Sequence, residues 1–294
     1  MTGLRDRFGD FVFAKVAGPQ GPQDRETIHG APGPRWFPHG SPITVVHGDA
    51  AMFVGGIRAV VLQTLHPVAM QAVSDHSGFR GDLWGRLART SRFLAVTTFG
   101  PEDQAEATVA HIRRIHDRVR GTMPDGTEYV ASDPHLLAWV HAAEVDSFLT
   151  AFDLYGPVRF DRATQDAYVA QAALVGERLG VIDPPRDVAA LKASLESFRP
   201  ELRSTPQARE AVYDVLWRPD LPLAARPGYA MLRSAAIASL PPWSREMLGL
   251  PVRPLRDRTL TRGLGHLSTR AVRWSLTGGQ ARAREIIAAR AHPA

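Results

Sequence analysis

The sequence has no cysteine among its 294 residues. This absence excludes disulfide bonds, a thiolate nucleophile, and every zinc, iron-sulfur or haem site held by cysteine. Any metal ion must therefore be bound by histidine, aspartate or glutamate. Lysine is nearly absent too, since Lys15 and Lys192 are the only two, so the net charge of +5 comes from arginine.

Long apolar runs are also missing. In the first eighteen residues the only unbroken apolar run is Phe11 to Ala14, which is far shorter than the core of a signal peptide. No segment approaches the ~20 apolar residues that a membrane span requires. We therefore expect a cytoplasmic protein without a transmembrane segment.

Several catalytic motifs do not occur. The chain has no Walker A loop, no GxGxxG after a strand, no GxSxG elbow and no HExxH. A carboxylate-bridged di-iron site would need two Glu-x-x-His repeats, whereas His141 and Glu144 stand once and in the reverse order. The usual routes to non-haem iron are therefore poorly supplied.

The patterns that are present predict an all-α protein. With 44% hydrophobic and 22% charged residues, the chain can bury a large core, and we expect a single large globular helical domain. Residues 1–40 form a Pro/Gly-rich N-terminal arm with one short helix at 4–17 and irregular chain at 18–40. Residues 41–250 form the helical domain, and 251–294 form basic C-terminal helices packed on it.

Apolar spacing and turn residues predict the individual helices. The expected ranges are 49–65, 82–98, 101–121, 133–151, 161–179, 187–198, 206–216, 221–239, 242–248, 256–277 and 280–289, with one short strand pairing near 122–132. The first range contains Gly55 and Gly56, which indicates close packing against another helix or a flat ligand. Pro67 ends or kinks that helix just after His66.

One histidine lies within an apolar stripe of the 101–121 helix. The stripe, spaced by three and four residues, comprises Ala105, Val109, Ile112, His116 and Val119. Arg120 follows one turn later, and Arg86 and Thr90 share a face of the preceding helix. One inward imidazole with nearby arginines is what a b-type haem requires of a helical protein. A core histidine satisfied by its neighbours is the alternative.

Four short segments carry a family resemblance: LQTLHP, RLARTSRF, RRIHDRVRG and YVASDPHLLAWVHA. In order and spacing they resemble the catalytic domain shared by the latex-clearing (rubber) oxygenases and the fungal MpaB oxygenases, over about residues 36–277. The resemblance implies a haem b whose iron is held by His116, with Arg120 four residues on. It also implies that Arg86 and Thr90 orient dioxygen on the opposite face.

Two departures bear on the expected substrate. Arg89 stands where the rubber-cleaving branch has a lysine that can approach the iron, so we count Arg89 among the cofactor-binding candidates. The glutamate base of that branch has no counterpart, because the chain has no glutamate between Asp49 and Arg80. We expect an apolar small molecule as substrate, unsaturated or isoprenoid, rather than rubber, with dioxygen and an electron donor as partners. His66 and His141 are candidate distal groups.

Two other interpretations stay open. The chain could be a non-catalytic helical protein that binds haem or a hydrophobic ligand, as a sensor does. Alternatively, the arginine-rich segment after Pro251 could contact membranes peripherally or bind nucleic acid. No nucleic-acid motif supports the latter partner, so we expect none.

Overall fold

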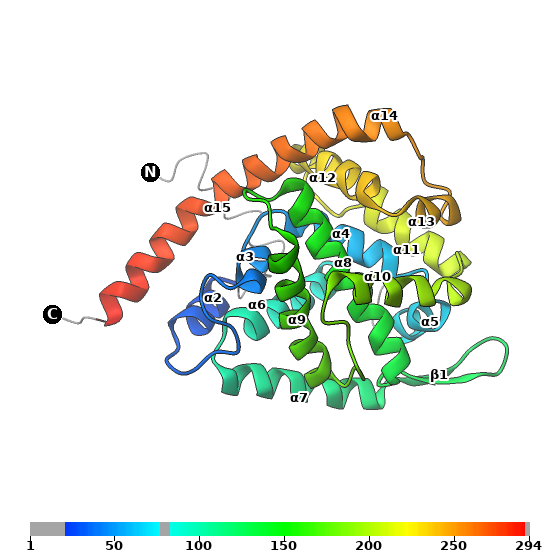
Figure 1. The fold of residues 1–294 in the computed structure, drawn as a ribbon, viewed down its shortest axis with the longest axis horizontal. Helices are drawn as coiled ribbons and strands as arrows, with labels where there is room; N and C mark the ends of the chain where they lie inside the picture. The colour runs from blue at the N-terminus through cyan, green and yellow to red at the C-terminus, as the bar shows by residue number, and fades with distance from the viewer. Residues whose placement is uncertain (1–20, 77–82, 292–294) are drawn as a thin grey trace.

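The computed structural model describes residues 21–76 and 83–291 (Figure 1). The helix expected at 4–17 lies outside these residues. Helices from N- to C-terminus are α2 Gly21–Gly30, α3 Pro42–His47, α4 Met52–Gln63, α5 Pro67–His76, α6 Leu83–Phe99, α7 Glu102–Arg118, α8 Pro134–Tyr155, α9 Arg162–Leu179, α10 Val188–Ser197, α11 Pro206–Trp217, α12 Arg226–Ser239, α13 Pro242–Met247, α14 Pro254–Arg256 and α15 Arg262–Ala291. Short η1 Arg199–Glu201, η2 Leu223–Ala225 and η3 Asp257–Thr261 join some of them. The predicted all-α class is confirmed.

One small sheet interrupts the helices in the described part of the chain. Strands β1 Arg120–Thr122 and β2 Glu128–Val130 pair antiparallel, with Thr122 opposite Glu128. Gly126 makes the turn between them with φ +90°, a conformation that glycine adopts without strain. The predicted strand pairing is therefore confirmed, and it stiffens the connection that leaves α7.

The centre of the fold is the contact between α4 and α8 (Figure 1). Gly55 lets the two helices approach closely, because a Cβ there would lie 2.9 Å from Cδ1 of Phe148. One turn later Arg58, only 2% exposed, reaches across to Asp146 at 2.6 Å and to the hydroxyl of Ser147 at 2.7 Å. Its Nε also donates to the backbone oxygen of Ser239 at the end of α12. The sequence indicated close packing at Gly55 but not this buried ion pair.

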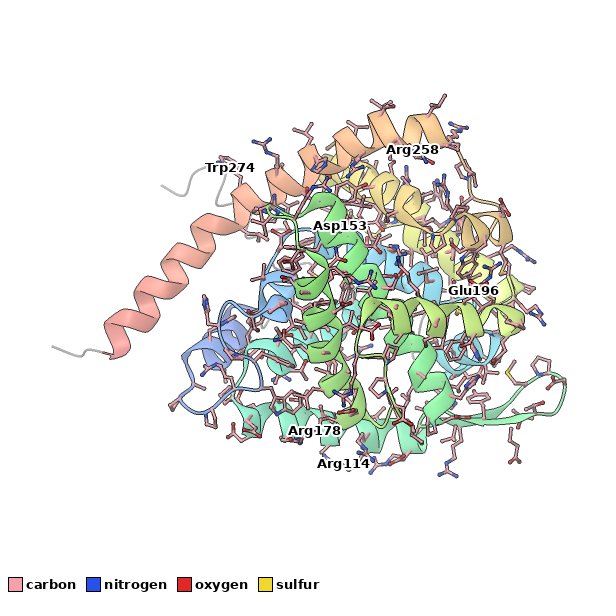
Figure 2. All side chains as sticks on the ribbon, in the orientation of Figure 1. Arg114, Asp153, Arg178, Glu196, Arg258 and Trp274 are labelled. Carbon is pink, nitrogen blue, oxygen red and sulfur yellow. The ribbon has the colours of Figure 1, made fainter. Side chains whose placement is uncertain are left out.

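The remaining helices cover this pair on different sides. Helix α12 packs on α4 and is itself covered by α15, whereas α9 contacts α8, α3 and α7. Helices α6 and α7 pack on each other, with α7 along one edge of the molecule (Figure 1). Arg178 of α9 forms an ion pair with Glu106 of α7, and Arg178 and Arg114 both lie at this edge (Figure 2). These contacts fix α7, the helix that carries His116.

Two expectations about the ends of the chain are wrong. Residues 21–30 of the arm form helix α2, which packs on α6 and α15, so the arm is not irregular there. The two helices expected at 256–277 and 280–289 are not separate, because α15 runs without a break from Arg262 to Ala291 after α14 and η3, and its end extends away from the body (Figure 1). Arg273 of α15 is bidentate to Asp49, at 2.7 and 2.8 Å, and this pairing ties the helix to the body.

None of the described helices is, by itself, both long and apolar enough to cross a membrane. Helices α4 and α5 reach the required length and composition only together, and they are bent by 104° at the break between them. The cytoplasmic location and the domain boundaries at 40 and 250 stay predictions.

The two adjacent glycines of α4 give the first testable prediction. Gly55→Ala should cost about 1–3 kcal/mol through overpacking on Phe148, partly offset by the about 1 kcal/mol by which alanine favours helix. Gly56→Ala is the matched control, because a Cβ there meets nothing within 4 Å and the helix gain remains. Urea denaturation should give Gly55→Ala the lower midpoint; equal midpoints would show that the helices do not touch at Gly55.

Candidate functional site

His116 lies in the last turn of α7, on the face that turns toward the protein. Ala105 and Val109 of the same stripe are buried, and Ile112 and His116 are half-buried. The helix begins after Pro101 with Glu102 and Asp103, acidic residues that suit the positive end of a helix. The stripe that the spacing predicted is therefore an inward face along most of its length.

The imidazole of His116 lacks a partner for one of its nitrogens. Its Nδ1 is buried and forms no hydrogen bond in the described part of the chain. Burial lowers the pKa of His116, while neighbouring Asp117 acts weakly in the opposite direction. The ring is therefore neutral near pH 7, which is the form that binds a metal. A buried ring nitrogen without a protein partner can be satisfied by a bound ligand, an ion or a water molecule.

The neighbouring helix α6 carries the predicted Arg86, Arg89 and Thr90. Arg86 is half-buried, and burial followed by the charge of Arg89 lowers its pKa, although a guanidinium keeps its charge at any physiological pH. Arg89 and Thr90 are exposed. Arg86 is the member of this group that is partly withdrawn from water, and its helix α6 packs on α7, which carries His116.

Arg120 lies in β1 rather than on α7. Its side chain is exposed, and its Nε donates to the backbone oxygen of Asp117 at 2.9 Å. The chain leaves the helix at Val119, whose ψ of 99° is extended, so the spacing of four residues after His116 does not place Arg120 one helical turn away. A contact between Arg120 and a cofactor stays a prediction.

A second group of polar side chains lies in the interior, on α3, α6, α8 and α9. Nδ1 of His47 is 2.8 Å from Oγ1 of Thr98, and its Nε2 is 3.4 Å from the hydroxyl of Tyr168. Burial lowers the pKa of His47 to about 3 and that of His141 to about 4. It raises the pKa of Glu144 to about 7. These groups are held close to neutrality.

His141 and Glu144, one turn apart on α8, do not pair with each other. No hydrogen bond or ion pair joins them within the described ranges, so the default pairing that their spacing suggested is not formed. His141 instead packs on Gly176 of α9, where a Cβ would lie 2.9 Å from its Cε1. The charge of Glu144 also contributes to the raised pKa of Tyr168, after burial, which places the two side chains near each other.

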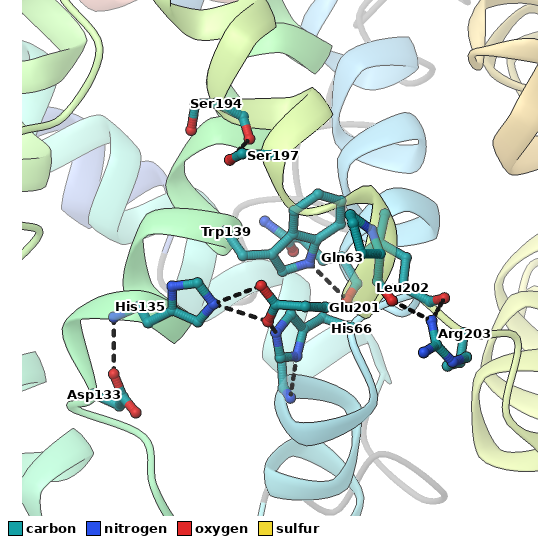
Figure 3. A network of polar contacts seen from close by, with 12 residues as sticks. Gln63, His66, Asp133, His135, Trp139, Ser194, Ser197, Glu201, Leu202 and Arg203 are labelled. Atoms are coloured by element: carbon teal, nitrogen blue, oxygen red, sulfur yellow. Dashed lines mark hydrogen bonds and ion pairs between the residues drawn. The ribbon is translucent and has the colours of Figure 1, made fainter.

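His66 lies at the predicted helix break and belongs to a different group. It is 3% exposed, and its Nδ1 accepts a hydrogen bond from the freed N–H of Ala69 at 3.5 Å. Its Nε2 faces Glu201 at 3.5 Å, and His135 also contacts Glu201 (Figure 3). The sequence did not indicate His135 or Glu201 as partners of His66, because both residues are far from His66 along the chain.

The described residues fit a haem in one specific respect. His116 offers a neutral imidazole with a buried, unpartnered nitrogen, and no cysteine competes as an axial ligand. A separate cavity of about 560 Å³ between α11 and α12 is lined partly by Arg218, Arg226 and Arg233 and contains none of the predicted residues.

Comparison of the sequence with known protein families shows the class of protein: an α-helical oxygenase domain, and hence an oxidoreductase. The chain belongs to the family described as ER-bound oxygenase mpaB/B'/Rubber oxygenase, catalytic domain, whose model matches residues 44–274. The comparisons with curated proteins and with solved structures gave no match. The family predicted from the four motifs is therefore confirmed.

The raised pKa of Glu144 predicts a pH-dependent loss of stability. Because its pKa is about 7 in the folded protein against 4.5 ordinarily, the folded state holds the extra proton between these values and stability falls as pH rises. A pKa that differs by one between the folded and unfolded states changes the free energy of unfolding by about 1.4 kcal/mol. Glu144→Gln should remove the penalty, so the variant should gain stability relative to the parent from about pH 4.5 to 7.

Urea denaturation at pH 5 and pH 8 measures this effect. Glu246→Gln, which removes a carboxylate from an exposed position, is the control for the loss of one charge. A stability difference between Glu144→Gln and the parent that is the same at both pH values would contradict the raised pKa of Glu144.

Proposed function

We propose that the protein is a haem b-dependent oxygenase acting on an apolar small molecule, and that His116 would hold the iron of the haem. Membership of the oxygenase family supplies the reaction class. The observation that carries the proposal is the neutral imidazole of His116 with its buried, unpartnered nitrogen. Unsaturated or isoprenoid compounds are the substrate class that the resemblance favours.

Haem, when bound, supplies the binding and activation of dioxygen. The protein supplies the surroundings. Arg86 on the adjoining helix is the half-buried cation best placed to donate N–H groups to oxygen or to a propionate, and Arg89 and Arg120 are more exposed candidates for the propionates. Thr90 adds a hydroxyl on the same helix. The electron donor is expected to dock from outside.

Glu144 is our candidate for the proton-holding group that the rubber-cleaving branch takes from an upstream glutamate. This chain has no glutamate between Asp49 and Arg80, but α8 supplies a carboxyl whose pKa of about 7 suits a general base at neutral pH. The neutral imidazole of His141 lies one turn away. His141 and Glu144 therefore replace His66 as the favoured distal groups, since His66 faces Glu201.

Removal of the axial ligand tests the cofactor. Purified protein, or apoprotein given haemin, should show a Soret band, and His116→Ala should abolish it while far-UV circular dichroism is unchanged. His111→Ala, an exposed histidine on the same helix, is the matched control and should keep the band. A colourless protein that takes up no haemin would refute the proposal.

Substitution of Glu144, the proposed proton-holding group, tests the proposed catalytic activity. Glu144→Gln should lower the rate of dioxygen consumption with an alkene substrate and reductant by about 100-fold or more, while the Soret band remains. Glu246→Gln should match the parent. If the parent binds haem and ligands without turnover, the protein is the non-catalytic sensor that the sequence left open.

A further inference from the structure

Three potential metal ligands from distant parts of the sequence meet at one point of the surface. His66 lies in the break between α4 and α5, His135 in the first turn of α8, and Glu201 at the end of η1 (Figure 3). One ligand atom of each lies within 4.8 Å of the other two. None of the three is among the residues proposed above for the haem site, although His135 shares helix α8 with His141 and Glu144.

His66 has an unsatisfied nitrogen that points into the group. Its side chain is only 4% exposed, and its Nε2 is buried and forms no hydrogen bond in the described part of the chain. The nearest acceptor is Oε2 of Glu201, at 3.5 Å. A buried polar nitrogen left in this state is costly unless something else occupies the gap.

The spacing of these atoms suits a metal ion better than a hydrogen bond. Ligands bound to Zn²⁺ at about 2.0–2.1 Å in a tetrahedron lie about 3.4 Å from one another. The 3.5 Å between His66 and Glu201 is close to that value. Nε2 of His135 lies nearer to the carboxylate, at 2.8 and 3.0 Å, but its exposed side chain can shift by a small rotation.

The surrounding fold holds the three ligands in place. The N–H of Arg203 donates to the backbone oxygen of Leu65 at 2.8 Å, which fixes the segment of Glu201 beside His66. Asp133 caps α8 by accepting from the backbone N–H of His135. The ring of Phe198 packs on those of His66 and His135, with centroids 6.3 and 4.7 Å away. Such preorganisation favours ion binding.

We propose that His66, His135 and Glu201 bind a divalent transition-metal ion of the Zn²⁺ type. Two imidazole nitrogens and one carboxylate oxygen are ligands that this ion prefers, and the exposed sides of His135 and Glu201 leave a fourth position open to water. Binding through Nε2 of His66 gives up the long 3.5 Å contact with Ala69. The ion ties the α4–α5 break to the start of α8 and to η1.

Zinc titration of the metal-free full-length protein tests the site. Isothermal titration calorimetry with ZnCl₂ should show one equivalent bound, and Glu201→Gln and His135→Ala should each weaken that binding by about 100-fold. Both positions are exposed, so folding should survive. His111→Ala is the control and should bind as the parent does. Thermal denaturation should show a zinc-dependent rise in Tm that both ligand variants lose.

His66→Asn separates the metal ligand from the structural role of this side chain. Asparagine is a good helix cap and can still accept from Ala69, so the variant should keep the Tm of the metal-free parent while losing the zinc response. The proposal is overturned if the parent binds no zinc at 1 mM ion. That concentration is about a thousand times the Kd of a site that binds with micromolar affinity. The proposal is equally overturned if zinc binds unchanged to all three variants.

Discussion

The rest of the structure depends on one constraint, the close approach of α4 to α8. The buried charge of Arg58 stabilises this approach. Arg58 is satisfied only when Asp146, Ser147 and the oxygen of Ser239 are all in reach. Removing one partner of a buried ion pair leaves the other charge buried without a partner. The loss of folding stability is then far larger than the net contribution of the intact pair. The two helices therefore have one favourable register, which Gly55 permits by leaving room for Phe148.

That register also determines which side chains of α8 face the protein interior on the sides of the helix that do not contact α4. With Asp146 and Ser147 turned to α4, His141 packs on Gly176 of α9 and Glu144 lies near Tyr168. Burial then shifts the pKa values of His141 and Glu144 in opposite directions, and in both cases toward the neutral form. The neutral forms of these two side chains suit the apolar substrate proposed above, and Glu144, with a pKa of about 7, can hold or release a proton near pH 7.

The sequence predicted the features that depend on local spacing. Helical periodicity located α4 and α6 to α9, and the glycine pair indicated a close helix contact because such residues weaken a helix unless packing requires them. Turn-like composition misled at Gly21–Gly30, where contacts with α6 and α15 stabilise a helix that propensity alone does not favour. The sequence did not indicate His47 as a site residue, since only the fold brings it close to Thr98 and Tyr168. Glu201 was likewise beyond reach, because nothing near it in sequence signals His66.

The two histidines with an unsatisfied nitrogen differ in what surrounds them, and this difference separates the two proposed sites. A bare ion needs three or four ligands from the protein, and His66 has a second imidazole and a carboxylate beside it. A porphyrin brings four nitrogens of its own, so its iron needs only one imidazole in an apolar setting. His116 shares its face with Val109 and Ile112, and no other histidine or acidic group joins it in a potential metal cluster among the described residues. The same chemical deficit therefore supports two different proposals, an ion at His66 and a flat cofactor at His116.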